Sequence, residues 1–123
     1  MNDVDWSKIK HFKKEEFCCK CGCGSCDVHP QLVAALDLAR STAGVPFKIT
    51  SGFRCARHNF RVGGKPSSSH TTGLAVDIAY ADGRQGLLIL KALLPYFDRV
   101  GVGADFIHVD IDLDKPSPML WTY

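Results

Sequence analysis

Residues 68–77 read Ser-Ser-His-Thr-Thr-Gly-Leu-Ala-Val-Asp and lead from a polar loop into an apolar segment. The continuation to residue 79 has the length and apolar character of a short β-strand. Because successive side chains of a strand point to opposite faces, Ala75 and Asp77 share one face and Val76 and Ile78 share the other. The segment therefore predicts a strand with one apolar face and one face that presents Asp77.

A second strand of the same kind is expected at residues 106–111. Its side chains alternate between Phe106, His108 and Asp110 on one side and Ile107, Val109 and Ile111 on the core side. If the two strands lie close together in one sheet, Asp77 and His108 converge on its polar face. His70 would then reach the same place from the loop that precedes the first strand.

The other segments predict an α+β fold, with a small antiparallel or mixed sheet and flanking helices in a single domain. A helix is expected from Pro30, which suits a first helical position, to the residue before Gly44, which suits a helix stop. The further expected elements are a strand at 46–50, an ordered loop region at 51–73, a helix at 84–94 and a strand at 99–102.

Two parts are expected within this compact domain. Residues 1–29 form an N-terminal arm that is rich in cysteine and lysine and packs on the core at 30–123. The lysines of the arm form either a solvated face or a contact with an anionic polymer such as a cell wall. They are Lys8, Lys10, Lys13, Lys14 and Lys20.

The composition limits the classes of function. The chain has 123 residues, 46% of them hydrophobic, and a formal net charge of +2, so it can form a core but gives no strong field toward nucleic acid or membranes. The longest apolar run, residues 87–90, is too short to cross a bilayer, and residues 1–6 lack the features of a secretory signal. We therefore expect a monomer, made in the cytoplasm, without a nucleic-acid or membrane partner.

His70, Asp77 and His108 form a set of two histidines and one carboxylate. Such a set can hold a divalent metal ion and leave a coordination position open for chemistry. The alternative is that each histidine is an ordinary hydrogen-bonded residue of a strand or loop. A metal site is favoured because a carboxylate faces His108, a second one lies three residues before it, and a Gly/Ser loop precedes His70.

Asp105 and Asp110 are the carboxylates on either side of His108. A zinc-bound water has its pKa lowered to about 7, and a nearby carboxylate can take its proton and pass it to a leaving amine. Asp105 is the candidate for that role, and its alternative is an ordinary turn residue after Gly103. Asp110 is on the same face as His108 and is expected to accept a hydrogen bond from a ligand histidine.

These motifs resemble the zinc D-Ala-D-Ala carboxypeptidase family, peptidase M15. The resemblance rests on Ser-x-His-x-x-Gly-x-Ala-x-Asp at 68–77 and His-Val-Asp at 108–110. It continues upstream in Ile-Thr-Ser-Gly-Phe-Arg at 49–54, His-Asn at 58–59 and Val-Gly-Gly at 62–64. It covers residues 12–111, most of the chain, and the combination of motifs is much more specific than any one of them.

The resemblance implies a role for each residue of the site. His70, Asp77 and His108 would be the zinc ligands, with Asp105 as the acid/base residue. Arg54 would be a catalytic electrophile at the scissile carbonyl or a clamp on the substrate, and its alternative is a structural ion pair. Ser68 would lie beside the substrate backbone, and its alternative is a turn-capping hydroxyl.

Two parts of the chain depart from the family. Relatives often have an aromatic residue and a longer segment where this chain has Ala104 in a short turn, which bears on the substrate wall and on Asp105. The tail at 115–123 has no clear family counterpart. Its Trp121 and Tyr123 are expected either to cap the core or to edge the cleft.

Cysteines are the second candidate metal ligands. Cys18, Cys21, Cys23 and Cys26 form two Cys-x-x-Cys pairs that suggest a structural zinc site, although one residue between the pairs requires a tight wrap. The alternatives are free thiols, or disulfides once the chain is outside the reducing cytosol. Cys55 is expected to pack against this cluster.

Two functions follow from these expectations. The first, implied by the resemblance, is zinc-dependent hydrolysis of a peptide bond in peptidoglycan stem peptides by metal-activated water. The enzyme would be either a phage or prophage endolysin, which reaches the wall after release, or an exported wall enzyme. The second is a metal-binding, non-catalytic module that contacts nucleic acid or cell wall through its cysteines and lysines. Carboxypeptidase and endopeptidase reactions would use the same zinc ligands, so these residues do not indicate which peptide bond is cut.

Overall fold

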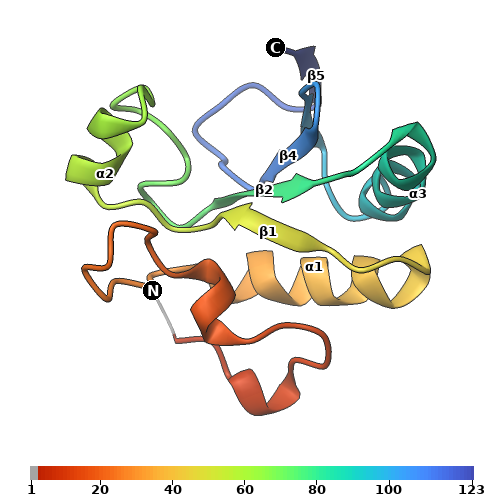
Figure 1. The fold of residues 1–123 in the computed structure, drawn as a ribbon, viewed down its shortest axis with the longest axis horizontal. Coiled ribbons are helices and arrows are strands. Elements are labelled where there is room, and N and C mark those ends of the chain that lie inside the picture. Colours follow the sequence, from red (N-terminus) through yellow and green to blue (C-terminus); the bar gives the residue numbers. More distant parts are fainter. Residues whose placement is uncertain (1–2) are drawn as a thin grey trace.

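A five-stranded mixed sheet forms the centre of the fold in the computed structural model, which describes residues 3–123 (Figure 1). The strands are β1 (Lys48–Ser51), β2 (Ala75–Ala79), β3 (Arg99–Val102), β4 (Phe106–Asp110) and β5 (Met119–Thr122). Their order in the sheet is β1-β2-β4-β3-β5, and only the β3–β5 pair is parallel. Together with the helices that flank it, this sheet confirms the predicted α+β class.

The register of the central strands places the polar residues in a row. Asp77 of β2 lies directly opposite His108 of β4, and Arg99 of β3 lies opposite Asp110 of β4. The predicted alternation along both strands is confirmed, because Val76, Ile78, Ile107 and Val109 are all buried in the core.

Two helices cover the apolar face of the sheet. Helix α1 (Pro30–Ala43) begins at a proline, after His29 caps it through a hydrogen bond from the Gln31 N–H, and ends before Gly44 at φ 73°. A φ in this left-handed region favours glycine, which explains why the helix stops there. Helix α3 (Gly83–Leu93) packs against α1, and the buried side chains of both join the core: Leu32, Leu36, Ile89 and Leu93.

The N-terminal arm is part of the same core. Its two 3₁₀ turns, η1 (Trp6–Lys8) and η2 (Lys14–Phe17), run beneath β1 and α1 in Figure 1. Phe12 and Phe17 are buried and stack edge-on, with ring centroids 5.5 Å apart. The Phe53 N–H also donates to the Phe17 carbonyl at 2.9 Å. Of the predicted arm at 1–29, residues 1 and 2 lie outside the described part of the chain.

Two elements were not predicted. Helix α2 (Ala56–Arg61) lies within the segment expected to be an ordered loop region, and β5 lies in the tail that was left unassigned. In Figure 1, helix α2 and β5 lie apart from each other, both above β2 in the view. Among residues 3–123 no helix is long and apolar enough to cross a membrane.

Candidate metal centre

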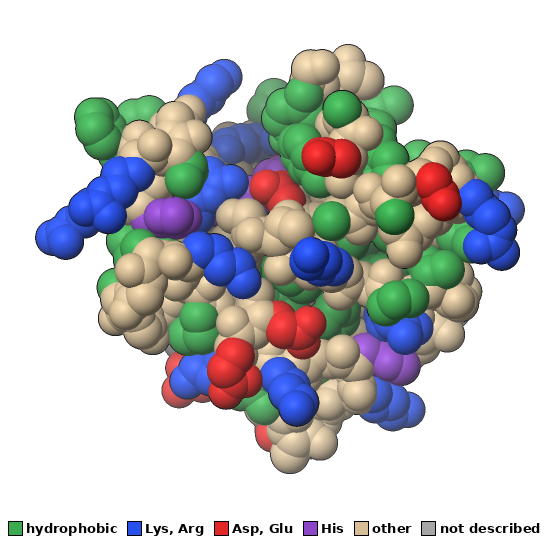
Figure 2. Space-filling model, viewed as in Figure 1, with side chains coloured by type: hydrophobic (Ala, Val, Ile, Leu, Met, Phe, Trp, Pro, Cys, Tyr) green, Lys and Arg blue, Asp and Glu red, His purple; other side chains and the backbone are tan. Residues whose placement is uncertain are grey.

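A cleft of about 420 Å³ opens on the polar side of the sheet. The space-filling view shows the surface hollowed between the lobes over α2 and β5, with histidine and acidic side chains in the hollow (Figure 2). The charged, histidine and aromatic side chains at the centre of this cleft are those of His70, Asp77, His108, Arg54, Arg99, Asp110, Trp121 and Tyr123.

His70, Asp77 and His108 meet in this cleft. The Asp77 Oδ1 atom lies 2.9 Å from His108 Nδ1 and 3.3 Å from His70 Nε2, and one ligand atom of each residue lies within 4.8 Å of the other two. Donor atoms about 2.1 Å from a tetrahedral zinc ion are separated by about 3.4 Å. The three side chains therefore fit one zinc ion with little movement.

His70 is oriented by the backbone. Its Nδ1 lies 2.8 Å from the Gly52 carbonyl oxygen, and since a carbonyl only accepts, Nδ1 carries the hydrogen. In the neutral imidazole this leaves the lone pair on Nε2, the atom that faces Asp77. A hydrogen bond to the far nitrogen of this kind fixes the tautomer and ring orientation of metal-binding histidines.

His108 is oriented by a carboxylate. Its Nε2 lies 2.8 Å from Asp110 Oδ2, while Asp110 Oδ1 accepts from the Arg99 Nε at 2.7 Å. The guanidinium of Arg99 also lies 4.9 Å from the ring centroid of Trp121. Nε2–H of His108 therefore donates to Asp110, and Nδ1 is the nitrogen turned toward Asp77 and a metal ion.

The pKa values of the three groups reflect this pairing. Burial would raise the pKa of Asp77, but the hydrogen bond from His108 and the adjacent imidazole of His70 outweigh it and bring the pKa below its ordinary value. Burial would lower the pKa of His108, but hydrogen bonds to Asp110 and Asp77 outweigh it and raise the pKa. The pKa of Asp110 is lowered because the hydrogen bonds from His108 and Arg99 outweigh burial.

A family model described as Peptidase M15 matches residues 10–110, close to the extent of the resemblance seen in the sequence. The chain belongs to the peptidase M15 family. Peptidases of this family are zinc-dependent, which agrees with a centre made of His70, Asp77 and His108. No curated protein matches the chain.

Arg54 of this M15 peptidase reaches the centre from the segment after β1. One of its terminal nitrogens lies 3.5 Å from Asp77 Oδ2. The guanidinium also donates to Ser51 Oγ at 2.9 Å and to Asn59 Oδ1 at 3.0 Å. Arg54 is thus held in the cleft by fixed partners, which is consistent with both a substrate contact and a structural ion pair.

Ser68 lines the cleft as expected, but its hydroxyl has a local partner. Ser68 Oγ accepts a hydrogen bond from the His70 N–H at 3.2 Å, which is the turn-capping arrangement. The neighbouring Ser69 donates to Asp112 Oδ2 at 2.7 Å and accepts from the Lys115 ammonium at 2.7 Å. These contacts fix the loop that carries His70.

Asp105 is not brought to the centre. It lies in the turn before β4, its side chain is exposed, and it is absent from the lining of the cleft. Its position along the chain shares the parity of Ile107 and Val109, which point away from the cleft. The role of Asp105 as the acid/base residue stays a prediction.

The sequence did not point to Arg99 and left Trp121 and Tyr123 between two roles. β5 pairs with β3 and brings Trp121 over Gly101, where a β-carbon would collide with the indole. The indole centroid lies 5.4 Å from that of His108, and Tyr123 packs on Phe106 with centroids 4.9 Å apart. Of the two expectations for the tail, edging the cleft is the one that the structure shows.

The sequence did carry a signal for Arg99. Strand alternation from residue 99 and a hairpin at Gly103 together place Arg99 opposite Asp110.

The predicted cysteine quartet needs correction. Cys18 and Cys26 form a disulfide with each other, so neither is free to bind a metal ion. Cys21 and Cys23 instead lie with Cys19 and with Cys55, the residue expected only to pack nearby. Local spacing favoured partners within the arm, whereas folding brings in one cysteine from outside it.

Proposed function

We propose that this chain hydrolyses a peptide bond in peptidoglycan stem peptides, with zinc held by His70, Asp77 and His108. The observation that carries the proposal is the meeting of these three side chains in the cleft of an M15 family member. Zinc bound there would supply a Lewis acid that activates water and polarises the scissile carbonyl.

The residues of the chain would hold and orient the reacting groups. The Gly52 carbonyl and Asp110 each accept from the ring nitrogen that faces away from the metal site, and so turn Nε2 of His70 and Nδ1 of His108 toward it. Arg54 lies beside Asp77, where its guanidinium can bind the substrate carbonyl oxygen or a carboxylate. Among the described residues, only two carboxylate side chains, those of Asp77 and Asp110, line the cleft, and both already have partners.

The substrate class is supported by the charge and shape of the cleft. Besides Arg54, the side chains of Lys65 and Lys115 line it, which suits the acidic groups and free carboxyl ends of stem peptides. Trp121 and Tyr123 form an aromatic wall on the β5 side. We further propose an endolysin-like enzyme that meets the wall after release from the cytoplasm, by analogy with the small members that residues 12–111 resemble.

The alternative of a nucleic-acid-binding module has less support. On the face drawn in Figure 2, lysine and arginine side chains are scattered among acidic and apolar ones. Such a distribution gives no continuous basic surface for a phosphate backbone on that face.

The test is digestion of purified peptidoglycan sacculi followed by mass spectrometry of the released fragments. We expect new peptide termini with intact glycan chains, and no release by the His70→Ala variant. A matched control is His11→Ala, since His11 is exposed and bonded to Ser41. Loss of a single D-Ala would identify a carboxypeptidase, and cleavage within the stem or cross-link an endopeptidase. The proposal would be contradicted if the zinc-loaded protein released neither D-Ala nor a peptide fragment from any peptidoglycan type.

A further inference from the structure

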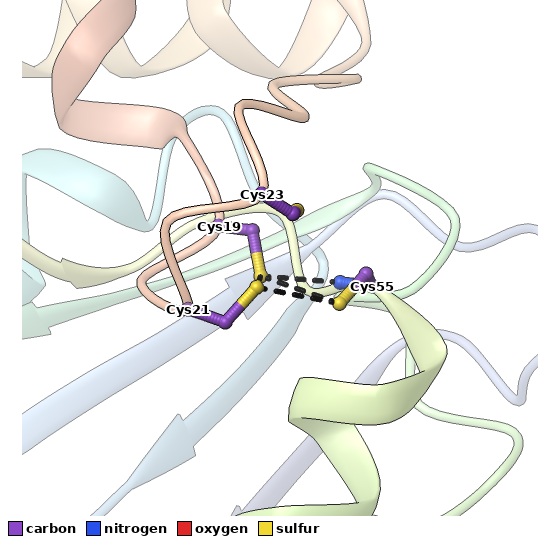
Figure 3. A group of neighbouring side chains, drawn as sticks. All are labelled: Cys19, Cys21, Cys23 and Cys55. Carbon is purple, nitrogen blue, oxygen red and sulfur yellow. Dashed lines mark hydrogen bonds between the residues drawn. The ribbon is translucent and has the colours of Figure 1, made fainter.

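Four cysteine side chains converge on the side of the molecule where the arm meets α2. Cys19, Cys21 and Cys23 come from the loop after η2, and Cys55 comes from the residue before α2 (Figure 3). The sulfur of Cys19 lies 3.4 Å from that of Cys21 and 3.7 Å from that of Cys55. Cys21 and Cys55 are 3.6 Å apart, and all four sulfurs lie within 4.8 Å of one another.

These separations match the edges of a tetrahedral metal site. Sulfurs about 2.3 Å from a zinc ion are about 3.8 Å apart in a tetrahedron, whereas a disulfide requires about 2.0 Å. Three of the sulfur–sulfur separations, 3.4, 3.6 and 3.7 Å, lie near the first value. The thiols of Cys19, Cys21 and Cys55 are therefore spaced for a shared ion, and the sulfur of Cys23 lies within 4.8 Å of each of them. None of the four is paired in a disulfide.

The backbone of the loop is shaped to gather these sulfurs. Gly22 and Gly24 have φ values of 84° and 82°, left-handed conformations that alternate with the cysteines and turn the chain back on itself. The Cys19 N–H closes the loop on the Ser25 carbonyl at 2.8 Å, and the Cys18–Cys26 disulfide closes its base.

Backbone donors also point at the sulfurs. The Cys55 N–H lies 3.4 Å from the Cys19 sulfur, and the His58 N–H lies 3.4 Å from the Cys55 sulfur. Hydrogen bonds of this kind favour the thiolate, which is the form that binds metal ions.

We infer that Cys19, Cys21, Cys23 and Cys55 form a tetrathiolate site for a structural zinc ion, separate from the His70–Asp77–His108 centre. Four thiolates without an open position are the ligand set of structural zinc sites. This inference does not depend on the reaction proposed above.

The position of the site indicates what the ion would do. Cys55 directly follows Arg54, whose N–H donates to the His70 carbonyl at 3.1 Å. Three residues before Cys55 is Gly52, whose carbonyl orients the His70 imidazole. An ion at the cysteines would fasten the N-terminal arm to this segment and so hold both groups in place, and its binding energy would add to folding stability.

The test is the absorption spectrum and metal content of the full-length protein, prepared under mildly reducing conditions and loaded with cobalt(II). Thiolate ligands give intense sulfur-to-cobalt charge-transfer absorption, which a site of two histidines and an aspartate cannot give. We expect two ions per chain and the charge-transfer band in the wild type. His70→Ala should lose one ion and keep the band, whereas Cys55→Ser should lose the band and keep the other ion.

A double variant separates the two cysteine quartets. Cys18→Ser together with Cys26→Ser should keep the band, because neither residue belongs to the proposed site. Loss of the band in this variant with its retention in Cys55→Ser would overturn the assignment in favour of the local quartet. Should the variants not fold, the wild type alone decides. Removal of the cysteine-bound ion by a chelator must make four thiols reactive together. A wild type that binds at most one ion and shows no charge-transfer band refutes the site.

Discussion

The carboxylate of Asp77 and the imidazole of His108 face each other across β2 and β4, with Oδ1 2.9 Å from Nδ1. Both residues are placed by the register of two paired strands rather than by a loop. The opposite faces of these strands are fully packed through Val76 and Val109, which are also paired across the sheet. The core thus fixes two of the three proposed ligands before any ion arrives.

Replacing Asp110 with Asn should weaken zinc binding at this centre. The amide can still accept from Arg99, but its NH₂ group would face Nε2 of His108, so the imidazole must move its hydrogen to Nδ1. That change blocks the proposed ligand nitrogen. We expect a loss of zinc affinity of about 10–100-fold, measured by competition with a chelator. Asp114→Asn is the control because Asp114 is exposed, and equal affinities of the two variants would contradict this role for Asp110.

Substituting Gly101 with Ala should disturb the aromatic wall. The added methyl group would overlap the indole of Trp121, which must leave its place over the Arg99 guanidinium. Overpacking of this kind costs about 1–3 kcal/mol, and we expect a lower melting temperature together with a lower kcat/KM. Gly83→Ala provides the comparison, since its β-carbon meets nothing within 4 Å. A melting temperature equal to that of the wild type would show that Trp121 is not packed there.

The Asp105→Asn variant tests the predicted acid/base role of this residue, since general acid–base residues contribute about 10²–10⁴-fold to the rate. From the exposed position outside the cleft that the structure gives Asp105, activity should stay within about twofold of the wild type. The measurement is the initial rate of fragment release from sacculi at matched zinc content. A drop of a hundredfold or more would show that the turn before β4 moves during the reaction and brings Asp105 to the substrate.

The stability of the metal-free protein should fall as the pH rises above neutrality. Hydrogen bonds to Asp110 and Asp77 raise the pKa of His108 above its ordinary value of 6.5, so the folded state binds this proton more tightly than the unfolded chain does. The contribution is complete below pH 6.5 and is lost as the pH rises through the raised pKa. Chelator-treated wild type and His108→Gln should therefore differ most in melting temperature at low pH. A difference that grows with pH would contradict this assignment.

Much of the site could be predicted because strand alternation is local. The segments around Asp77 and His108 show apolar residues on one side and polar residues on the other, and only their adjacency had to be assumed. The helix from Pro30 to Ala43 was likewise marked by its own start and stop residues, and the structure confirms both ends.

The rest depended on contacts between distant segments. Helix α2 has only six residues, and its N-cap is a cysteine rather than one of the usual capping residues, so the sequence carried no helix signal. Strand β5 is largely exposed, and its place beside β3 is marked mainly by Trp121 on Gly101. Cys55 lies far along the chain from the cysteines of the arm. Asp105 lies one residue before β4, so strand alternation alone does not decide where its side chain points.

The central claim is that His70, Asp77 and His108 together bind the catalytic zinc ion. The most direct measurement is anomalous X-ray diffraction at the zinc absorption edge from crystals of the zinc-loaded protein. The structure predicts an anomalous peak bonded to His70 Nε2, a carboxylate oxygen of Asp77 and His108 Nδ1. A zinc-loaded, active protein with no peak among these three atoms would contradict the account.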